Sequence, residues 1–156
     1  DKNKGFDLLV ESLKFIKCNN VILLIFGNNK KYIIDINIEV KYFGNINDHL
    51  FLNKLYSASD VTVVPSRSEN LPNTLIESFL SGTPGVAFDV GGISDIIEHK
   101  INGYLAKPFD IFDLAKGIDY CLLKYNSNID TRKEVEKKFS LENLINKYIQ
   151  LYQSLL

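Results

Sequence analysis

The sequence predicts an α/β domain in which helices cover both faces of a doubly wound parallel sheet. Short apolar runs that suit strands alternate with longer segments whose apolar residues recur at helical spacing. This alternation is typical of β-α-β units with right-handed crossovers. The chain has 156 residues, about the length of one domain, and no repeat or low-complexity linker divides it. We therefore expect a single domain.

Five apolar runs are predicted strands, at 21–27, 40–44, 61–65, 85–90 and 104–106. The first of them, VILLIFG, is continuously apolar and closed by a glycine, which predicts a strand buried on both faces of the sheet. The last follows the turn signal Asn102-Gly103. Residues 28–38 fit either a short strand or an irregular crossover, and both alternatives stay open.

Helical spacing predicts seven helices, at 6–16, 49–59, 72–82, 94–99, 110–125, 131–139 and 141–155. Asp48 is placed to cap the second of them, and Gly82 is placed to end the third. Pro72 suits the first position of the third helix, because a proline lacks the N–H that this position leaves unpaired.

The composition narrows the function. A net charge of −1 provides no basic surface to neutralise phosphates, so we expect no nucleic-acid partner. The two cysteines, Cys18 and Cys121, lie far apart in apolar helical segments, which predicts free buried thiols in a reducing compartment, the cytoplasm. No apolar run reaches the roughly 18 residues of a membrane span, and no signal-peptide pattern opens the chain. The chain contains no methionine and begins at Asp1, so we expect it to be part of a longer protein.

Several kinds of chemistry lack their motifs. The sequence has neither a GxGxxG nor a GxxxxGK[ST] phosphate loop, and it has no GxSxG nucleophile elbow. The two histidines, His49 and His99, have no Cys or His neighbour at ligand spacing, so we expect no metal site.

The loop after the third predicted strand carries the strongest functional signal, within VTVVPSRSENLPNTLIESFLSGTPGVAFDVGG (61–92). Parallel sheets bind ligands at the carboxyl ends of their strands, where this loop lies. With Pro72 opening a helix, the free amides of residues 73–75 would point into the crevice and form an anion site. Glu69 and Glu77 flank that site, where carboxylates would repel phosphate but accept hydrogen bonds from sugar hydroxyls. The pattern suggests a sugar on either side of a pyrophosphate, as in a nucleotide sugar.

The two glutamates, and three further features of the sequence, each have a functional and a purely structural explanation. Glutamate is common in the first turns of helices because it favours the helix dipole. Gly91-Gly92 permits close approach of the backbone to a phosphate or sugar, or it is only a turn at a strand exit. Lys4 is either a cation for a pyrophosphate or a solvated side chain. Gly27 and Gly44 end strands, where bare backbone suits a flat base or simply stops the strand.

Four blocks of the sequence resemble one protein family. They are KGFDLLVESL (4–13), LYSASDVTVVPSRSENLPNTLIESFLSGTPGVAFDVGG (55–92), SDIIEHKINGYLAKP (94–108) and FSLENLINKYIQLY (139–152). Together they are similar to the C-terminal, donor-binding domain of the retaining GT-B glycosyltransferases of family 4 (glycosyl transferases group 1), notably bacterial members of polysaccharide biosynthesis. The resemblance implies a Rossmann-like domain that forms one half of a GT-B fold. It makes Glu69 and Glu77 the E-x7-E pair of the family.

The resemblance implies a role for each matching residue. Glu69 would lie near the transferred sugar, for positioning and charge stabilisation, and Lys4 would neutralise the pyrophosphate. Glu77 would hold the ribose hydroxyls. The distal phosphate would lie against the backbone amides of Leu71, Asn73 and Thr74.

Backbone and small side chains would complete the implied site. The backbone near Gly27 and at Asn45-Ile46 would hold the base, and that of Gly91-Gly92 would approach the donor. Asn70 stands where the family often has a glycine, a departure that would tune the choice of sugar. Gly85 stands where valine is frequent, and we expect it to loosen a strand.

The implied reaction transfers a sugar from a nucleoside diphosphate sugar, with retention at the anomeric carbon and without a metal or cofactor. The acceptor would be a glycan or a lipid-linked molecule in polysaccharide biosynthesis. The family's arginine before the lysine and its N-terminal acceptor domain fall outside residues 1–156, so we expect this chain alone to bind donor weakly and transfer nothing. That domain would carry any contact with the inner face of the membrane. Two alternatives stay open: another GT-B enzyme, epimerase or phosphorylase-like, and a non-catalytic α/β nucleotide-binding module.

Overall fold

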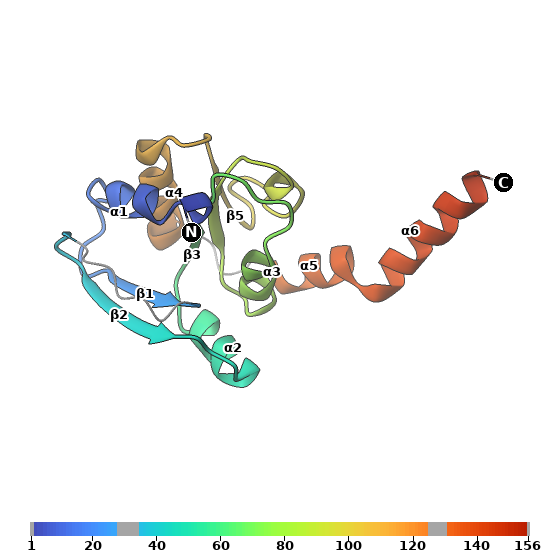
Figure 1. Ribbon diagram of the computed structural model, residues 1–156, viewed down its shortest axis with the longest axis horizontal. Coiled ribbons are helices and arrows are strands. Elements are labelled where there is room, and N and C mark those ends of the chain that lie inside the picture. Colours follow the sequence, from blue (N-terminus) through green and yellow to red (C-terminus); the bar gives the residue numbers. More distant parts are fainter. Residues whose placement is uncertain (1, 28–34, 125–130, 156) are drawn as a thin grey trace.

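The chain folds with the alternating α/β architecture that the sequence predicts (Figure 1). A computed structural model describes residues 2–27, 35–124 and 131–155. Its strands are β1 (Ile22–Phe26), β2 (Glu39–Gly44), β3 (Thr62–Val64), β4 (Gly85–Phe88) and β5 (Gly103–Ala106). All the strand pairs are parallel, which confirms the predicted fold class.

The described strands form two hydrogen-bonded groups, β1-β2 and β3-β4-β5. In the first group the register shifts between Ile25 and Phe26. The side chains of β1 are only partly buried, and that of Ile22 is 45% exposed. The prediction of a strand covered on both faces is therefore wrong for 21–27. The reason is its position, because β1 pairs with β2 alone among the described strands and lies to one side of the three-stranded sheet (Figure 1).

The helices follow the predicted order. They are α1 (Phe6–Leu13), α2 (His49–Ser57), α3 (Asn73–Leu80), α4 (Ile111–Lys124), α5 (Thr131–Phe139) and α6 (Leu141–Ser154), with two 3₁₀ turns, η1 (Lys2–Lys4) and η2 (Ile93–Asp95). Asp48 caps α2, as predicted, by accepting hydrogen bonds from two backbone amides. Residues 28–34 and 125 lie outside the described part of the chain, so the open alternatives for 28–38 are settled only for 35–38, which is irregular.

Two predicted helices end three or more residues before the expected position, and side chains bond to the backbone groups that follow. The segment 94–99 forms only η2, since the side chain of Asn102 accepts from the amide of Glu98 and donates to the carbonyl of Ile96. The first helix ends at Leu13 and not at residue 16. Just beyond it, the carboxylate of Asp119 accepts from the amides of residues 17 and 18, at 2.9 and 3.1 Å.

The central strand β4 is covered on both faces. The side chains of Val86 and Phe88 belong to a cluster with α1, α4 and β5. Between them, Ala87 faces the other way, into a cluster with α3, α5 and the segment after η2. All three side chains are fully buried. The core of the domain therefore consists of two apolar clusters, one on each face of β4, and each is covered by helices.

Two paired glycines allow α3 and β5 to lie close to β4. Gly85 and Gly103 are register partners on β4 and β5. A Cβ at Gly85 would lie 2.6 Å from a methyl carbon of Leu75, and one at Gly103 would lie 2.2 Å from the carbonyl oxygen of Gly85. We expected Gly85 to loosen a strand, but the structure gives it another role. It leaves the space into which Leu75 and Phe79 of α3 pack.

The last helix leaves the body of the domain. α5 packs against α3, and α6 extends away from it (Figure 1). Several apolar side chains of α6 are 47% exposed or more: Ile145, Tyr148, Ile149, Leu151 and Tyr152. None of the described helices is both long enough and apolar enough to cross a membrane.

Gly103→Ala should destabilise the domain more than Gly85→Ala. The new methyl group at Gly103 meets a backbone oxygen, which cannot move without shifting β4, whereas at Gly85 it meets the end of a flexible leucine. We expect the free energy of unfolding to fall by about 2–3 kcal/mol for Gly103→Ala and by about 1 kcal/mol for Gly85→Ala. Urea denaturation of the two variants measures both values, and equal losses would contradict the prediction.

Candidate functional site

The N-terminus of α3 is open, as the sequence predicts, although its geometry differs in detail. Pro72 is the N-cap residue, with φ −72° and ψ 110°, and not the first helical residue. No side chain of the described residues caps this end. The amide of Leu75 donates to the carbonyl of Pro72 at 3.0 Å, so the prediction that it is free is wrong. The amides of Asn73 and Thr74 have no acceptor within the described part of the chain, and two donors remain for an anion.

Glu69 and Lys4 form an ion pair at the same edge of the sheet. Lys4 Nζ lies 2.7 Å from Glu69 Oε2, and Ser66 Oγ donates to the same oxygen at 3.2 Å. The side chain of Glu69 is only 16% exposed, whereas that of Lys4 is 62% exposed. The structure therefore brings together Glu69, assigned to the transferred sugar, and Lys4, assigned to the pyrophosphate. The lysine reaches the covered carboxylate from the solvent.

Gly91 and Gly92 support the loop that carries Glu69. A Cβ at Gly91 would lie 1.8 Å from the carbonyl oxygen of Glu69, and one at Gly92 would lie 2.2 Å from that of Asn70. Only glycine permits these approaches, and Gly91 also has a φ of +57°. We predicted that bare backbone at 91–92 serves a ligand. The structure gives the two glycines a role within the protein itself.

Arg67 joins this loop to the N-terminal turn η1. Its amide donates to the carbonyl of Asn3 at 2.7 Å, and its Nη1 donates to that of Lys2 at 2.8 Å. Its guanidinium also forms a bidentate pair with the carboxylate of Asp7, at 2.7 and 2.6 Å. Sequence reasoning missed both residues, because they lie 60 positions apart in the sequence.

Glu77 has a different protein partner. The hydroxyl of Tyr56 donates to Glu77 Oε2 at 3.1 Å. Tyr56 is 2% exposed, and its burial and the nearby carboxylate raise the pKa of its hydroxyl, which keeps it a donor. Its ring lies edge-on to that of Phe26, with 5.5 Å between the centroids. Phe26 precedes Gly27 at the end of β1, so Tyr56 connects Glu77 with the segment that we predicted to hold a base.

Glu77 and Tyr56 line a hollow of about 320 Å³ between α2, α3 and α5. Leu52, Asn53 and Ser81 also line it. Glu69 does not, and it contacts Lys4 and Ser66 instead. The two glutamates of the predicted pair thus face separate protein surroundings.

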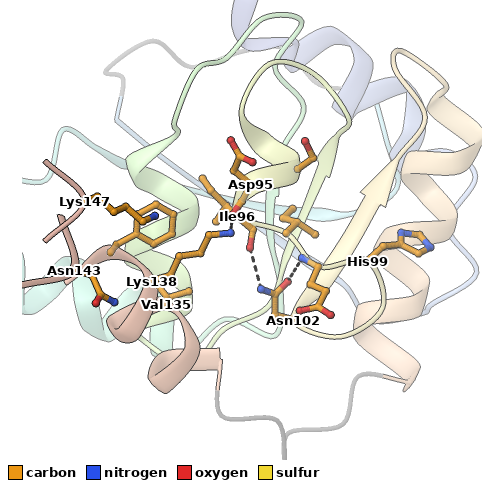
Figure 2. A pocket seen from close by; sticks show the side chains of 12 residues that line it. Asp95, Ile96, His99, Asn102, Val135, Lys138, Asn143 and Lys147 are labelled. Carbon is orange, nitrogen blue, oxygen red and sulfur yellow. Dashed lines mark hydrogen bonds between the residues drawn. The ribbon is translucent and has the colours of Figure 1, made fainter. Parts of the chain in front are cut away.

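A larger hollow, of about 660 Å³, lies between residues 94–102 and the junction of α5 and α6 (Figure 2). Two of its polar side chains are used within the protein: that of Asn102 bonds to the loop, and Lys138 Nζ donates to the carbonyl of Asp95. None of the predicted site residues lines it. We therefore do not place the site there.

The other predicted residues lie where strands end. Gly27 follows β1, and its amide donates to the carbonyl of Gly44, the last residue of β2, at 2.8 Å. Asn45, which is exposed, and Ile46, which is partly buried, come next in the chain. Asn70 and Leu71 are exposed between β3 and α3. All the predicted segments after β1, β2, β3 and β4 thus lie at the carboxyl ends of parallel strands, where such sheets bind ligands.

The Arg67–Asp7 pair predicts an acid-sensitive contact. The hydrogen bonds from Arg67 hold the pKa of Asp7 below its ordinary value, although partial burial acts in the opposite direction. Because the folded-state pKa is lowered, the pair contributes its stability above the ordinary pKa and loses it as the pH falls through the lowered one. In Arg67→Met the pKa of Asp7 should rise to its ordinary value or above. Carboxyl chemical shifts followed by NMR during an acid titration measure this pKa, and an unchanged value would contradict the prediction.

Comparison with known proteins identifies the family to which this chain belongs. The sequence model of the family described as glycosyl transferases group 1 matches residues 1–138. An uncharacterized glycosyltransferase of Methanocaldococcus jannaschii is 29% identical, over 96% of this chain and 42% of that protein. A poly(ribitol-phosphate) alpha-N-acetylglucosaminyltransferase of Staphylococcus aureus is 31% identical, over 97% of this chain and 33% of that protein.

A solved structure confirms the fold. The crystal structure of Anabaena Alr3699/HepE in complex with UDP superposes with a TM-score of 0.81 at 24% identity, and the match covers 100% of this chain and 46% of that one. The chain thus spans less than half the length of each of these three proteins. It is a member of the glycosyl transferases group 1 family, and its fold is that of a Rossmann-like half of a GT-B glycosyltransferase.

Proposed function

We propose that this chain is the donor-binding domain of a retaining, family 4 glycosyltransferase. It moves a sugar from a nucleoside diphosphate sugar to a glycan or lipid-linked acceptor in polysaccharide biosynthesis. The observation that carries the proposal is the contact between Lys4 and Glu69, in the loop that leads to the uncapped N-terminus of α3. The UDP complex of the Anabaena protein and the polymer acceptor named for the S. aureus relative agree with it.

The diphosphate binds at the N-terminus of α3. The amides of Asn73 and Thr74 donate to the distal phosphate, together with that of Leu71, and the helix dipole favours its charge. Lys4 is largely exposed, so its ammonium turns from Glu69 toward the phosphates with little obstruction. These fixed donors stabilise the charge that develops on the leaving diphosphate.

Glu69 holds the transferred sugar. Ser66 orients one carboxylate oxygen, and the other accepts a hydrogen bond from a sugar hydroxyl. Its negative charge also favours the positive charge that develops on the sugar ring. We assign it to positioning and charge stabilisation, with the acceptor attacking from the face that the diphosphate leaves, which retains the configuration. Asn70, next in the loop, tunes the choice of sugar.

Glu77 holds the ribose. Tyr56 donates to Oε2, which leaves Oε1 and further lone pairs for the two ribose hydroxyls. The base lies against the backbone of Gly27, Asn45 and Ile46, at the ends of β1 and β2. Gly91 and Gly92, which support the loop of Glu69, also let the donor approach the backbone.

The acceptor belongs to the part of the enzyme outside this chain. We assign the acceptor site to an N-terminal domain, because the relatives are more than twice as long as this chain. That domain also accounts for any attachment at the inner face of the membrane, in the cytoplasm. Accordingly, residues 1–156 alone should transfer no sugar. Measurable transfer by this fragment would contradict the assignment of the acceptor site to another domain.

Nucleotide binding by the intact protein tests the donor site. Calorimetry with UDP, GDP and ADP identifies the base, and Lys4→Ala should then weaken the preferred diphosphate about tenfold, because one charge-assisted hydrogen bond is lost. Glu77→Gln should weaken it by a similar factor. Lys14→Ala is the matched control, since Lys14 also forms an exposed ion pair, with Glu11 at 2.8 Å, on the next helix. Binding of none of the three nucleotides would favour a different α/β module, and equal losses in the lysine variants would refute the assigned site.

Sugar transfer by the intact enzyme distinguishes it from other GT-B enzymes. With the matching nucleotide sugar, we expect a product that keeps the anomeric configuration, formed equally well in the presence of EDTA. NMR of the product gives the configuration. Inversion, loss of activity with the chelator, or epimerised donor instead of transfer would each overturn the corresponding part of the proposal.

A further inference from the structure

We propose that Arg67 is a positioning residue for Lys4, acting through a clasp with Asp7. This inference rests on the proposed function, because it concerns how the lysine is presented to the donor diphosphate. Arg67 lies two residues before Glu69, and Asp7 lies three residues after Lys4. The clasp therefore spans the Lys4–Glu69 contact and ties together the two segments that carry it.

The turn that carries Lys4 needs such support. η1 has only three residues, too few to be stable by itself. The long Lys4 side chain is 62% exposed and contacts Glu69 alone among the contacts described, so the position of its backbone determines which groups the ammonium can reach. Arg67 supplies that constraint with two hydrogen bonds, from its amide to the carbonyl of Asn3 and from Nη1 to that of Lys2.

Asp7 supplies the rigid end of the clasp. It lies in the first turn of α1, where a carboxylate is favoured by the helix dipole. Both of its oxygens accept from the guanidinium, at 2.7 and 2.6 Å, and this fork fixes the plane of the arginine. A lysine at position 67 would place a charge there but could not bond to Asp7 and to the Lys2 carbonyl in the same planar arrangement.

The exposure of the clasp indicates positioning more than fold stability. The Arg67 side chain is 27% exposed and that of Asp7 is 59% exposed. Ion pairs that are this accessible contribute little to the stability of a fold. The loss of Arg67 should therefore act mainly on the placement of Lys4, at the phosphate end of the donor and not at its base.

The positioning role is tested in the intact protein by comparing its affinities for UDP and UMP. If the protein prefers another base, GDP and GMP or ADP and AMP are compared instead. Arg67→Met should weaken the diphosphate about tenfold and the monophosphate less than twofold, because the distal phosphate depends most on Lys4. Arg67→Lys should recover only part of the loss, and Asp7→Asn should weaken the diphosphate in the same direction. Lys14→Met, which removes another exposed ion pair of α1, should change neither affinity.

A double-mutant cycle completes the test. If Arg67 acts through Lys4, then Arg67→Met should weaken the diphosphate no further in a Lys4→Met background. Urea unfolding midpoints check that each variant is folded. If Arg67→Met does not fold, Asp7→Asn replaces it in the cycle. Equal losses for diphosphate and monophosphate, or fully additive losses in the cycle, would overturn the inference. If Lys4→Met weakens the diphosphate while Arg67→Met and Asp7→Asn do not, the inference fails alone; if the natural sequence binds no nucleotide, the proposed function fails with it.

Discussion

Three carbonyl oxygens of one loop rest directly against glycines, and the candidate site depends on this close contact. The carbonyls of Pro65, Glu69 and Asn70 would lie 1.8, 1.8 and 2.2 Å from a Cβ at Gly5, Gly91 and Gly92, respectively. A side chain at any of the three would move the loop. The position of Glu69 is therefore set by backbone contacts on both sides. Side chains such as Arg67 then hold the segment that carries Lys4, which contacts Glu69.

Part of this arrangement follows from the sequence and part does not. The alternation of elements, the cap at Asp48 and the open helix after Pro72 are local patterns, and local patterns predicted them correctly. Gly91-Gly92 was recognised as a place of close approach, but the group that approaches it in the structure is the chain itself. The contact of Arg67 with Asp7 left no local signal, because only the parallel sheet brings the ends of β3 and the start of α1 together.

The separate surroundings of Glu69 and Glu77 show a further limit of spacing arguments. The sequence predicts that the two carboxylates lie on either side of one anion site. In the structure, Glu69 is covered and paired with a lysine, whereas Glu77 lies on the exposed surface of α3 and accepts from a buried tyrosine. Spacing gives the position of a carboxylate along the chain, but Lys4 of η1 and Tyr56 of α2, which contact these two glutamates, are distant in the sequence.

In the proposed function the partner of Glu69 has to change during donor binding. A carboxylate that is 16% exposed requires hydrogen-bond or ionic partners, because covering an unpaired charge is costly. Lys4 supplies one while the site is empty of donor. When the diphosphate draws the ammonium away, a hydroxyl of the transferred sugar can take its place as a partner of Glu69, whereas a nucleoside diphosphate without that sugar offers no such hydroxyl. The same ion pair therefore keeps the lysine near the phosphate site and makes its transfer to the diphosphate most favourable when the sugar is present.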